Sequence, residues 1–381
     1  MNIFLNLLAG TTGGQITRAR AFLDRVEQFA PDIQLIVVKD NHVLKEYKTI
    51  ERRLIIDVSI GQGKLKALKR ILWENTVMPR LIKQYESDIF LTFSHYLPFK
   101  KLKVPTLVGI SNLAPFSALA LKEESLASKI KFGILKRTIL LSAGRADSVI
   151  ALSQTAEKVL ISNGIDQMKI KVIHIGVDKF WSDSLNDTSS LLQMGISKPF
   201  FLYVSHFYRY KNHLRLIKAF STLPTRIKDN NQLVLVGKPE DKAYFDEIVY
   251  EIRKNGLEKN VLLIPGEGME VLRCLYQRTS LFIFPSLVEN CPNILLEAMA
   301  AGAPIATVDI EPMNEYCQVS AEYFEGTNIN SIANTIIKLV DDSRRIDEMR
   351  MLSHIKAKSY SWNNFVSNVV AETRSLYLKK K

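Results

Sequence analysis

The sequence predicts an α/β protein built from two doubly wound domains. Short apolar runs of the strand type alternate with longer helical patterns along the chain. This alternation favours parallel sheets whose strands are joined by crossover helices. The alternation restarts after the turn-rich segment 182–197, and 381 residues are enough for two domains that each have a core.

The first half supplies its strands and helices in regular order. Residues 2–8 (NIFLNLL) predict a strand, residues 15–29 a helix and residues 33–38 (IQLIVV) a second strand. Three further strands are predicted, each followed by a helix-like stretch, at residues 88–93, 105–111 and 147–152. We assign residues 1–185 to this first domain.

The second half repeats the pattern. Five apolar runs predict its strands, at residues 199–205, 231–237, 260–266, 280–285 and 303–309. We assign residues 198–360 to the second domain and the amphipathic residues 361–381 to a terminal helix. In open parallel sheets, ligands bind beyond the carboxyl ends of the strands. Two such domains facing each other would form a central cleft lined by strand-end loops.

The composition argues against several classes of protein. Hydrophobic residues make up 47% and charged residues 24%, as in soluble globular proteins. The three cysteines have no paired spacing, which argues against a disulfide scaffold or a zinc site and favours a reducing compartment. The start MNIFLNLLAG lacks a basic leader, and no apolar run is long enough to span a bilayer. We therefore expect a cytoplasmic protein.

The net charge of +12 is concentrated in the first half of the chain. Residues 1–190 carry about 27 Lys and Arg against about 18 Asp and Glu. Much of the excess lies in two amphipathic stretches, residues 63–83 and 125–145. Such helices suit an anionic membrane surface, although ordinary solvent-facing helices packed on a sheet have the same pattern. No signature of a nucleic-acid-binding fold is present, so we expect no nucleic-acid partner.

The most informative segment is residues 281–315. An apolar strand ends at a Pro-Ser turn, and a helical pattern then begins near Asn293. Asn290 is the predicted N-cap, and Pro292 is tolerated in a first turn because that position needs no backbone donor. The free N–H groups of a helix start favour an anion. We therefore predict that Asn290, Cys291, Pro292, Asn293 and Ile294 line an anion site.

Two carboxylates, Glu289 and Glu297, flank this predicted anion site. One lies in the loop and the other about two turns into the helix. This pattern suits the recognition of a phosphorylated sugar through its hydroxyl groups. Alternatively, Glu297 could be a favourable charge near a helix N-terminus and Glu289 a solvated loop residue.

The segment SLFIFPSLVENCPNILLEAMAAGAPIATVDIEPMNEY resembles the signature of the family 4 retaining glycosyltransferases, which have two Rossmann-like domains and the GT-B architecture. The mark of that family is Glu-x7-Glu. The resemblance implies that Glu289 recognises the donor sugar and Glu297 the ribose of the nucleotide. It also implies a terminal helix that crosses back onto the first domain. Near Glu315 the chain departs from the family, because Met313-Asn314 precedes it where the family has proline.

A basic loop follows the first strand of the second domain. The segment YVSHFYRYKNHLRLIKAF is similar to the family loop whose Arg and Lys hold the donor diphosphate. Lys211 falls on the family lysine, whereas His206 stands where the family has arginine. Arg209 could supply the missing cation, since arginine binds phosphate bidentately. The alternative is a solvated basic turn. We assign catalytic roles to Glu289, Lys211 and Arg209, and a donor-binding role to His206.

No Asp-x-Asp motif is present, so we expect no metal and no cofactor besides the nucleotide-diphosphate sugar itself. Fixed cations and backbone amides would then stabilise the leaving diphosphate.

The first domain offers weaker signals. Gly10-Thr11-Thr12-Gly13-Gly14 links the first strand to a helix, and glycines there allow a ligand close to the backbone. We assign ligand binding to Gly13 and Gly14, although a tight strand-to-helix turn explains them nearly as well. His95 ends a predicted strand, but a lone histidine is more often structural than catalytic.

Together these features predict a glycosyltransferase that moves a sugar from a nucleotide-diphosphate donor to an acceptor with retention. The basic first domain favours a lipid-linked acceptor at the inner face of a bacterial membrane, in the assembly of a surface polysaccharide or lipopolysaccharide. Two alternatives stay open. One is a nucleotide-sugar epimerase or hydrolase, and the other is a basic membrane or nucleic-acid adaptor without catalysis.

Overall fold

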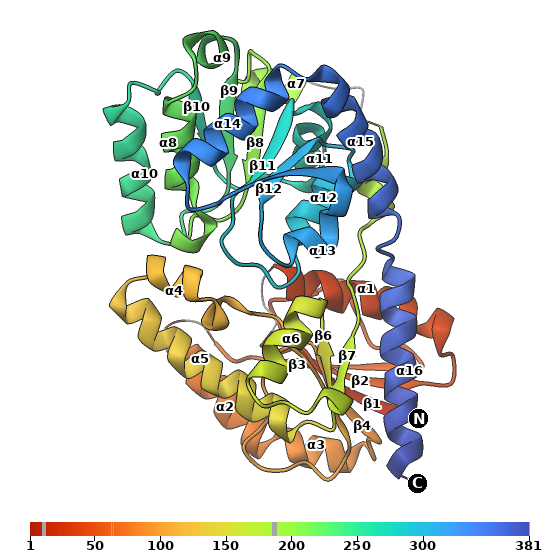
Figure 1. The fold of residues 1–381 in the computed structure, drawn as a ribbon. Coiled ribbons are helices and arrows are strands. Elements are labelled where there is room, and N and C mark those ends of the chain that lie inside the picture. Colours follow the sequence, from red (N-terminus) through yellow and green to blue (C-terminus); the bar gives the residue numbers. More distant parts are fainter. Residues whose placement is uncertain (10–12, 62, 64, 185–188, 381) are drawn as a thin grey trace. The chain divides into compact units, whose positions relative to one another are not determined.

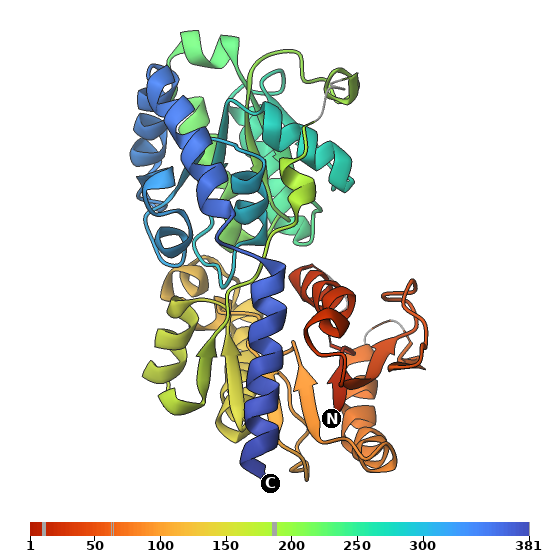
Figure 2. The ribbon, with the colours of Figure 1, turned by 90° about the vertical axis from the view of Figure 1, so that its right-hand side faces the viewer.

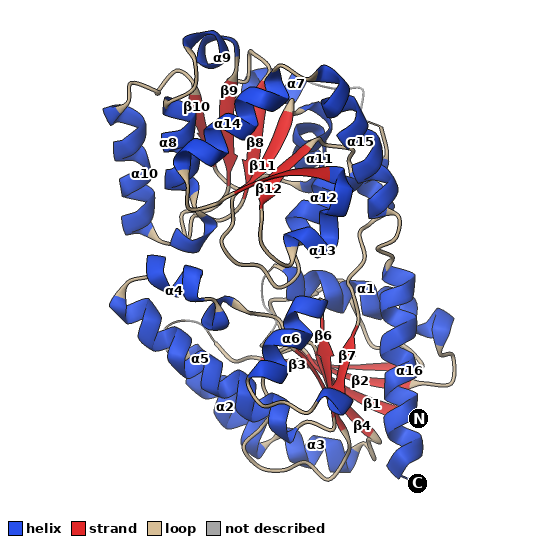
Figure 3. Cartoon of the chain, in the orientation of Figure 1, coloured by secondary structure: helices blue, strands red, loops and turns tan. Residues whose placement is uncertain are grey.

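The computed structural model describes residues 1–9, 13–61, 63, 65–184 and 189–380, and it contains two compact units (Figure 1). The first unit comprises Met1–Phe116, Ile130–Gly176 and Ser361–Lys381. The second comprises Ser117–Lys129 and Val177–Tyr360. Each unit has its own parallel sheet with helices on both faces (Figure 3).

The sheet of the first unit has seven strands in the order β3-β2-β1-β4-β5-β6-β7, all parallel. The strand order reverses between β1 and β4, as in doubly wound folds. The strands are β1 (Asn2–Asn6), β2 (Gln34–Asp40), β3 (Arg53–Val58), β4 (Ile89–Thr92), β5 (Thr106–Gly109), β6 (Ser148–Ala151) and β7 (Ile170–Val172).

Six helices accompany this sheet. They are α1 (Gly14–Phe29), α2 (Lys66–Thr76), α3 (Met78–Gln84), α5 (Leu126–Arg145), α6 (Gln154–Ser162) and the terminal helix α16 (Trp362–Lys380). The first residues of α5 group with the second unit. Helix α16 runs beside α1 and the sheet of the first unit, as Figures 1 and 2 show from two sides. The ring of Phe365 on α16 packs 5.8 Å from that of Phe93, so the chain returns to the first unit through buried aromatic contacts.

The second unit has a six-stranded parallel sheet in the order β10-β9-β8-β11-β12-β13. Its strand order reverses between β8 and β11. The strands are β8 (Phe200–Val204), β9 (Gln232–Val236), β10 (Val261–Ile264), β11 (Leu281–Phe284), β12 (Ile305–Val308) and β13 (Ala321–Phe324). Strands β8, β9, β11 and β12 are buried throughout, which explains why they read as continuous apolar runs.

The helices of the second unit are mostly amphipathic and bury one face on this sheet. They are α4 (Ala118–Glu123), α7 (Ser189–Gln193), α8 (His213–Ser221), α9 (Thr225–Asn230), α10 (Lys242–Lys254), α11 (Met269–Arg278), α12 (Asn293–Ala300), α13 (Met313–Cys317), α14 (Ile329–Val340) and α15 (Ser343–Ala357).

The predicted fold class is confirmed, but the predicted strand set is incomplete. The sequence analysis missed β3, β7 and β13. Strand β3 pairs with β2 alone and is only partly buried, so its apolar pattern is interrupted. Strand β7 has only three residues, and β13 is fully buried only at its two ends, so neither segment shows a clear apolar run.

The predicted domain boundaries differ from the contact-based units at two places. The predicted first domain ends at residue 185, whereas the second unit already includes the chain from Val177 onward. The prediction treats residues 1–185 as continuous, whereas Ser117–Lys129 packs with the second unit. Arg215 on α8 forms a 2.9 Å ion pair with Glu123 at the end of α4, which ties this segment down. In the part of the chain that the structure describes, no helix is long and apolar enough to cross a membrane.

Candidate functional site

The candidate site of the second unit lies in the loops that follow β8 and β11. These strands are neighbours at the point where the strand order reverses, and open α/β sheets bind ligands beyond the carboxyl ends of such strands. The loop after β8 runs through a short 3-10 turn, Arg209–Lys211, into α8. The loop after β11 leads into α12. All the site residues predicted in the second half lie in these loops or on α12.

Lys211 and Glu289 meet at this site. The Lys211 Nζ lies 2.5 Å from the Glu289 Oε1, and the two side chains are only 14% and 12% exposed. The buried Tyr203 hydroxyl donates to the Lys211 carbonyl at 2.9 Å, which fixes the turn that carries the lysine. The structure thus brings together two of the three predicted catalytic residues, which are 78 positions apart in the sequence.

Arg209 is held elsewhere. Its guanidinium forms a bidentate pair with Glu247 of α10 and lies 3.7 Å from an oxygen of Asp241. It also stacks over the Tyr244 ring at 5.2 Å. The hydrogen bond with Glu247 raises the pKa of Arg209 above its ordinary value. To bind a phosphate beside Lys211, Arg209 would have to leave this pair, so its catalytic role stays a prediction.

His206 does not replace the missing arginine as a cation. Its Nδ1 accepts a hydrogen bond from the backbone N–H of Lys238 at 3.2 Å. Partial burial lowers the pKa of His206 below its ordinary value. Glu240 opposes this shift, whereas the nearby Lys211 and Lys238 add to it. His206 is therefore a neutral group at pH 7, able to form a hydrogen bond but not an ion pair with a phosphate.

The helix start that follows β11 differs in detail from the prediction. Asn290 is not the N-cap, because α12 begins at Asn293 and Pro292 occupies the cap position with a non-helical ψ of 80°. The first hydrogen bond of the helix is donated by the Leu296 N–H to the Pro292 carbonyl at 3.0 Å. The N–H groups of Ile294 and Leu295 therefore have no intrahelical acceptor, which leaves them suited to an anion.

The two remaining predicted residues lie beside this helix start. Asn290 is buried, and Cys291 has intermediate exposure. The Cys291 Sγ lies 3.7 Å from the Asn293 Oδ1.

Glu297 lies in the second turn of α12, beside the buried Tyr276. The Tyr276 hydroxyl donates to the Glu297 Oε2 at 3.4 Å. Burial raises the pKa of Glu297 to about 8, and the nearby Asp178 contributes in the same direction, whereas the tyrosine hydrogen bond opposes the shift. At pH 7 the Glu297 carboxyl is thus mostly protonated and can both donate and accept a hydrogen bond.

The sequence analysis missed Asn212. It is buried, adopts the left-handed conformation (φ 67°) and separates the basic turn from α8. Its Nδ2 donates to the carbonyls of Pro285 at 3.1 Å and Gly326 at 2.7 Å, so one side chain connects the loops after β8, β11 and β13. The only signal in the sequence is an Asn before a helical pattern, since asparagine tolerates this conformation.

Asn212→Ala is expected to lower the free energy of unfolding by about 2–3 kcal/mol, because two buried carbonyls lose their donor. Urea unfolding followed by circular dichroism measures this change. Asn230→Ala is the matched control, since the Asn230 Nδ2 donates only to a carbonyl four residues away on an exposed helix. Equal losses in the two variants would contradict the bridging role of Asn212.

The predicted residues of the first half are only partly described. Gly13 has φ 60° and precedes α1, which begins at Gly14, so this turn requires a glycine. Gly10, Thr11 and Thr12 lie outside the described residues. Ligand binding by Gly13 and Gly14 therefore stays a prediction.

His95 follows β4 and is half-buried in the first unit. Burial and, to a lesser degree, the nearby Arg70 lower the pKa of His95 to about 4. Among the described residues its Nδ1 has no hydrogen-bond partner. His95 is therefore neutral at pH 7, and nothing on the ring marks it as a proton carrier.

The described residues contain no group of three or more His, Cys, Asp or Glu side chains that could hold a metal ion. Cys274, Cys291 and Cys317 form no disulfide with one another. The expectation of a metal-independent reaction stays a prediction.

Two family models match the chain. Residues 12–179 match the model described as Glycosyltransferase Family 4, and residues 194–358 match that described as Glycosyl transferases group 1. Together they cover most of the sequence.

Several curated proteins are similar in sequence. An uncharacterized glycosyltransferase of Methanocaldococcus jannaschii is 23% identical over 275 residues, which are 71% of this chain and 66% of that protein. The serotype-specific mannosyltransferase WbdA of Escherichia coli is 26% identical over 234 residues, 58% of this chain and 28% of WbdA. The O-antigen chain mannosyltransferase B of Escherichia coli is 25% identical over 175 residues, 44% of each chain. The chain thus spans less than two thirds of the length of these relatives.

Solved structures match over nearly the whole chain. Sucrose-phosphate synthase from Thermosynechococcus elongatus superimposes with a TM-score of 0.78 at 16% identity and covers 100% of both chains. HepE from Anabaena, solved in complex with UDP and glucose, gives a TM-score of 0.76 at 17% identity and covers 98% of this chain and 100% of HepE. At this identity the comparison shows the shared two-domain fold.

Proposed function

Since the chain belongs to the glycosyltransferases of the group 1 and family 4 type with the GT-B fold, we propose that it transfers a sugar from a nucleotide-diphosphate donor to an acceptor. The observation that carries this proposal is the Lys211–Glu289 pair at the carboxyl ends of β8 and β11. A cation, a carboxylate and the start of α12 lie together there, which suits a ligand with a phosphate, a sugar and a ribose.

Positively charged groups would hold the diphosphate of the donor, and carboxyl groups would hold its hydroxyl groups. Lys211 and the N–H groups of Ile294 and Leu295 supply positive charge for the diphosphate. Glu289 accepts hydrogen bonds from the hydroxyl groups of the sugar, and Glu297 binds the ribose. HepE, which shares this fold, binds UDP and glucose, and this supports a nucleotide sugar as the donor.

The same groups would assist the chemical step. Cleavage of the bond between the sugar and the phosphate leaves negative charge on the diphosphate, and fixed donors aimed at that charge lower the barrier. The charge of Lys211 is paired with that of Glu289. Donor binding would insert the phosphate beside the lysine and leave Glu289 to the sugar. Retention of the anomeric configuration is part of this proposal and rests on the family resemblance.

The acceptor and its pathway are a further part of the proposal. We infer a lipid-linked saccharide in the assembly of a bacterial surface polysaccharide or lipopolysaccharide, at the cytoplasmic face of the membrane. The similarity to the O-antigen chain mannosyltransferase B and to WbdA supports this pathway, as does the basic character of the first half.

One observation favours a non-catalytic adaptor instead. His206 is neutral and Arg209 is engaged with Glu247, so the loop presents fewer cations than the resembling family. A turnover assay separates the alternatives. The protein is incubated with UDP-, GDP-, ADP- and dTDP-sugars, with and without a lipid extract as the source of acceptor, and release of the nucleoside diphosphate is measured.

A transferase releases the nucleoside diphosphate from one donor class, and the rate rises when the extract is present. Release that is independent of the extract would point to a hydrolase. Isomerisation of a donor sugar would point to an epimerase. If none of the nucleotide sugars is converted, the result would support the adaptor.

A further inference from the structure

The proposed donor site has one lysine for two phosphates. Each phosphate of a nucleotide-diphosphate sugar carries a negative charge, but Lys211 is paired with Glu289 and Arg209 is held by Glu247. His206, which stands where the resembling family has arginine, is neutral. The free N–H groups at the start of α12 add only partial charge. The site is therefore short of one fixed cation.

One other cation lies on the loops at this edge of the sheet. Six loops follow the strands of the second unit, and all of their residues are described: 205–212, 237–241, 265–268, 285–292, 309–312 and 325–328. The Lys and Arg residues on these loops are Arg209, Lys211 and Lys238. Lys238 follows β9, the neighbour of β8 in the sheet. Unlike the other two, it forms no ion pair with a residue that the structure describes.

The loop that carries Lys238 is hydrogen-bonded to the loop that carries His206. The Phe207 N–H donates to the Lys238 carbonyl at 2.9 Å, and the Lys238 N–H donates to the His206 Nδ1 at 3.2 Å. Only glycine fits at Gly237, because a Cβ there would lie 1.9 Å from the Ser205 carbonyl oxygen. Lys238 therefore lies directly beside the residue that replaces the arginine of the resembling family.

The same contact determines which nitrogen of His206 carries the proton. Since the Nδ1 accepts a hydrogen bond, the hydrogen of the neutral ring is on the Nε2, which can donate to a phosphate oxygen. After burial, the groups that shift the pKa of His206 are Glu240, Lys211 and Lys238, so both lysines lie near this ring. The stem of Lys238 lies along the backbone of Gly266, where a Cβ would be 3.4 Å from its Cγ and Cε. The lysine side chain thus stays at the carboxyl edge of the sheet.

We propose that Lys238 is the second diphosphate-binding cation of this chain and that the His206 Nε2–H donates to the same diphosphate. The lysine compensates, from the neighbouring strand end, for the arginine that the loop after β8 lacks. A lysine contributes a compact charge that can contact either phosphate, whereas the neutral histidine contributes a single hydrogen bond. This role of Lys238 rests on the proposed function and adds a residue to its donor site.

The test is calorimetric titration of nucleoside diphosphates. UDP, GDP, ADP and dTDP are titrated into wild type, and the one that binds is then titrated into the variants. Lys238→Ala is expected to bind it about tenfold more weakly, because a lost contact between a charged donor and a phosphate has an effect of this size. Lys238→Arg keeps the charge and should bind within about threefold of wild type. Adding His206→Arg to Lys238→Ala should recover most of the lost affinity, since it returns a cation to the same place.

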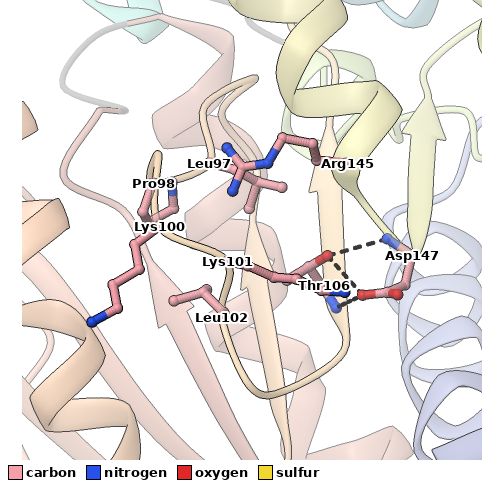
Figure 4. A pocket seen from close by; sticks show the side chains of 8 residues that line it. All are labelled: Leu97, Pro98, Lys100, Lys101, Leu102, Thr106, Arg145 and Asp147. Carbon is pink, nitrogen blue, oxygen red and sulfur yellow. Dashed lines mark hydrogen bonds between the residues drawn. The ribbon is translucent and has the colours of Figure 1, made fainter.

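Lys101→Ala is the control variant. Lys101 lines a basic pocket of about 190 Å³ in the first unit, together with Lys100 and Arg145 (Figure 4). Thr106, the first residue of β5, lines the same pocket, which therefore lies at the amino end of that strand and not at a carboxyl end. The variant removes the same charge from the chain and should bind the diphosphate like wild type.

The outcomes separate the role of Lys238 from the proposed function. Equal affinity of wild type and Lys238→Ala, or a loss of the same size in Lys101→Ala, would overturn the role of Lys238 and leave the donor site in place. A loss that neither Lys238→Arg nor His206→Arg repairs would be an effect on the loop structure, and would overturn it too. Since Lys238 is exposed, an unchanged melting temperature shows that its variants are folded. If no nucleoside diphosphate binds wild type, the proposed donor site itself is wrong and the role of Lys238 falls with it.

Discussion

Lys211→Ala is expected to lower kcat/KM for the sugar donor by about 100- to 1,000-fold. Removal of one fixed donor from a site that stabilises developing negative charge has an effect of this size. The lysine is 14% exposed and held by its carbonyl contact with Tyr203, so another side chain cannot easily take its place. Initial rates of nucleoside diphosphate release, measured over a range of donor concentrations, give the change.

Two further variants, one at Glu289 and one at Lys242, test whether the effect is specific to Lys211. Glu289→Ala is also expected to reduce kcat/KM strongly. Because the two residues contact each other, the fold-loss of kcat/KM in the variant with both substitutions should be smaller than the product of the two single fold-losses. Lys242→Ala is the control, since Lys242 forms an exposed ion pair with Asp246. Full activity in Lys211→Ala, or a loss of the same size in Lys242→Ala, would contradict a specific role for Lys211.

Glu297→Gln is expected to change the pH dependence of stability. The folded pKa of about 8 lies above the ordinary value of 4.5, so between these pH values the folded chain keeps a proton that the unfolded chain has released. The free energy of unfolding therefore falls as the pH rises through this range and levels off above the folded pKa. Glutamine cannot ionise, so the variant should lose this part of the decline and become more stable at pH 8 than wild type.

Urea unfolding at pH 5, 6.5 and 8 measures this effect for wild type and Glu297→Gln. The same carboxyl is expected to bind the nucleotide, so Glu297→Ala should weaken nucleotide binding about 2- to 10-fold, as the loss of a hydrogen bond between neutral groups predicts. If the free energy of unfolding depends on pH in the same way in wild type and in Glu297→Gln, Glu297 is ionised in the folded chain at these pH values. The assignment of a raised pKa to Glu297 would then be wrong.

The fold could be predicted from the sequence because the central strands of parallel sheets are buried on both faces. Strands β8, β9, β11 and β12 therefore appear as uninterrupted apolar runs. The strands that the sequence did not predict are short or only partly buried, and such segments carry little pattern.

The site could be predicted only where local sequence decides it. Lys211 and Glu289 follow the ends of two buried strands, so their meeting depends on the strand order and on little else. The position of Arg209 depends instead on Glu247, 38 residues away on a helix whose packing the sequence does not reveal. The raised pKa of Glu297 likewise comes from burial against Tyr276, a tertiary contact.

The most direct test of the donor site is calorimetric titration of UDP, GDP, ADP and dTDP into wild type, Lys211→Ala and Lys242→Ala. We predict that wild type and Lys242→Ala bind one of these nucleotides with the same affinity, and that Lys211→Ala binds it at least tenfold more weakly. If no nucleotide binds to the folded wild type, or if Lys211→Ala binds as tightly as wild type, the second unit is not a nucleotide-sugar site built around Lys211.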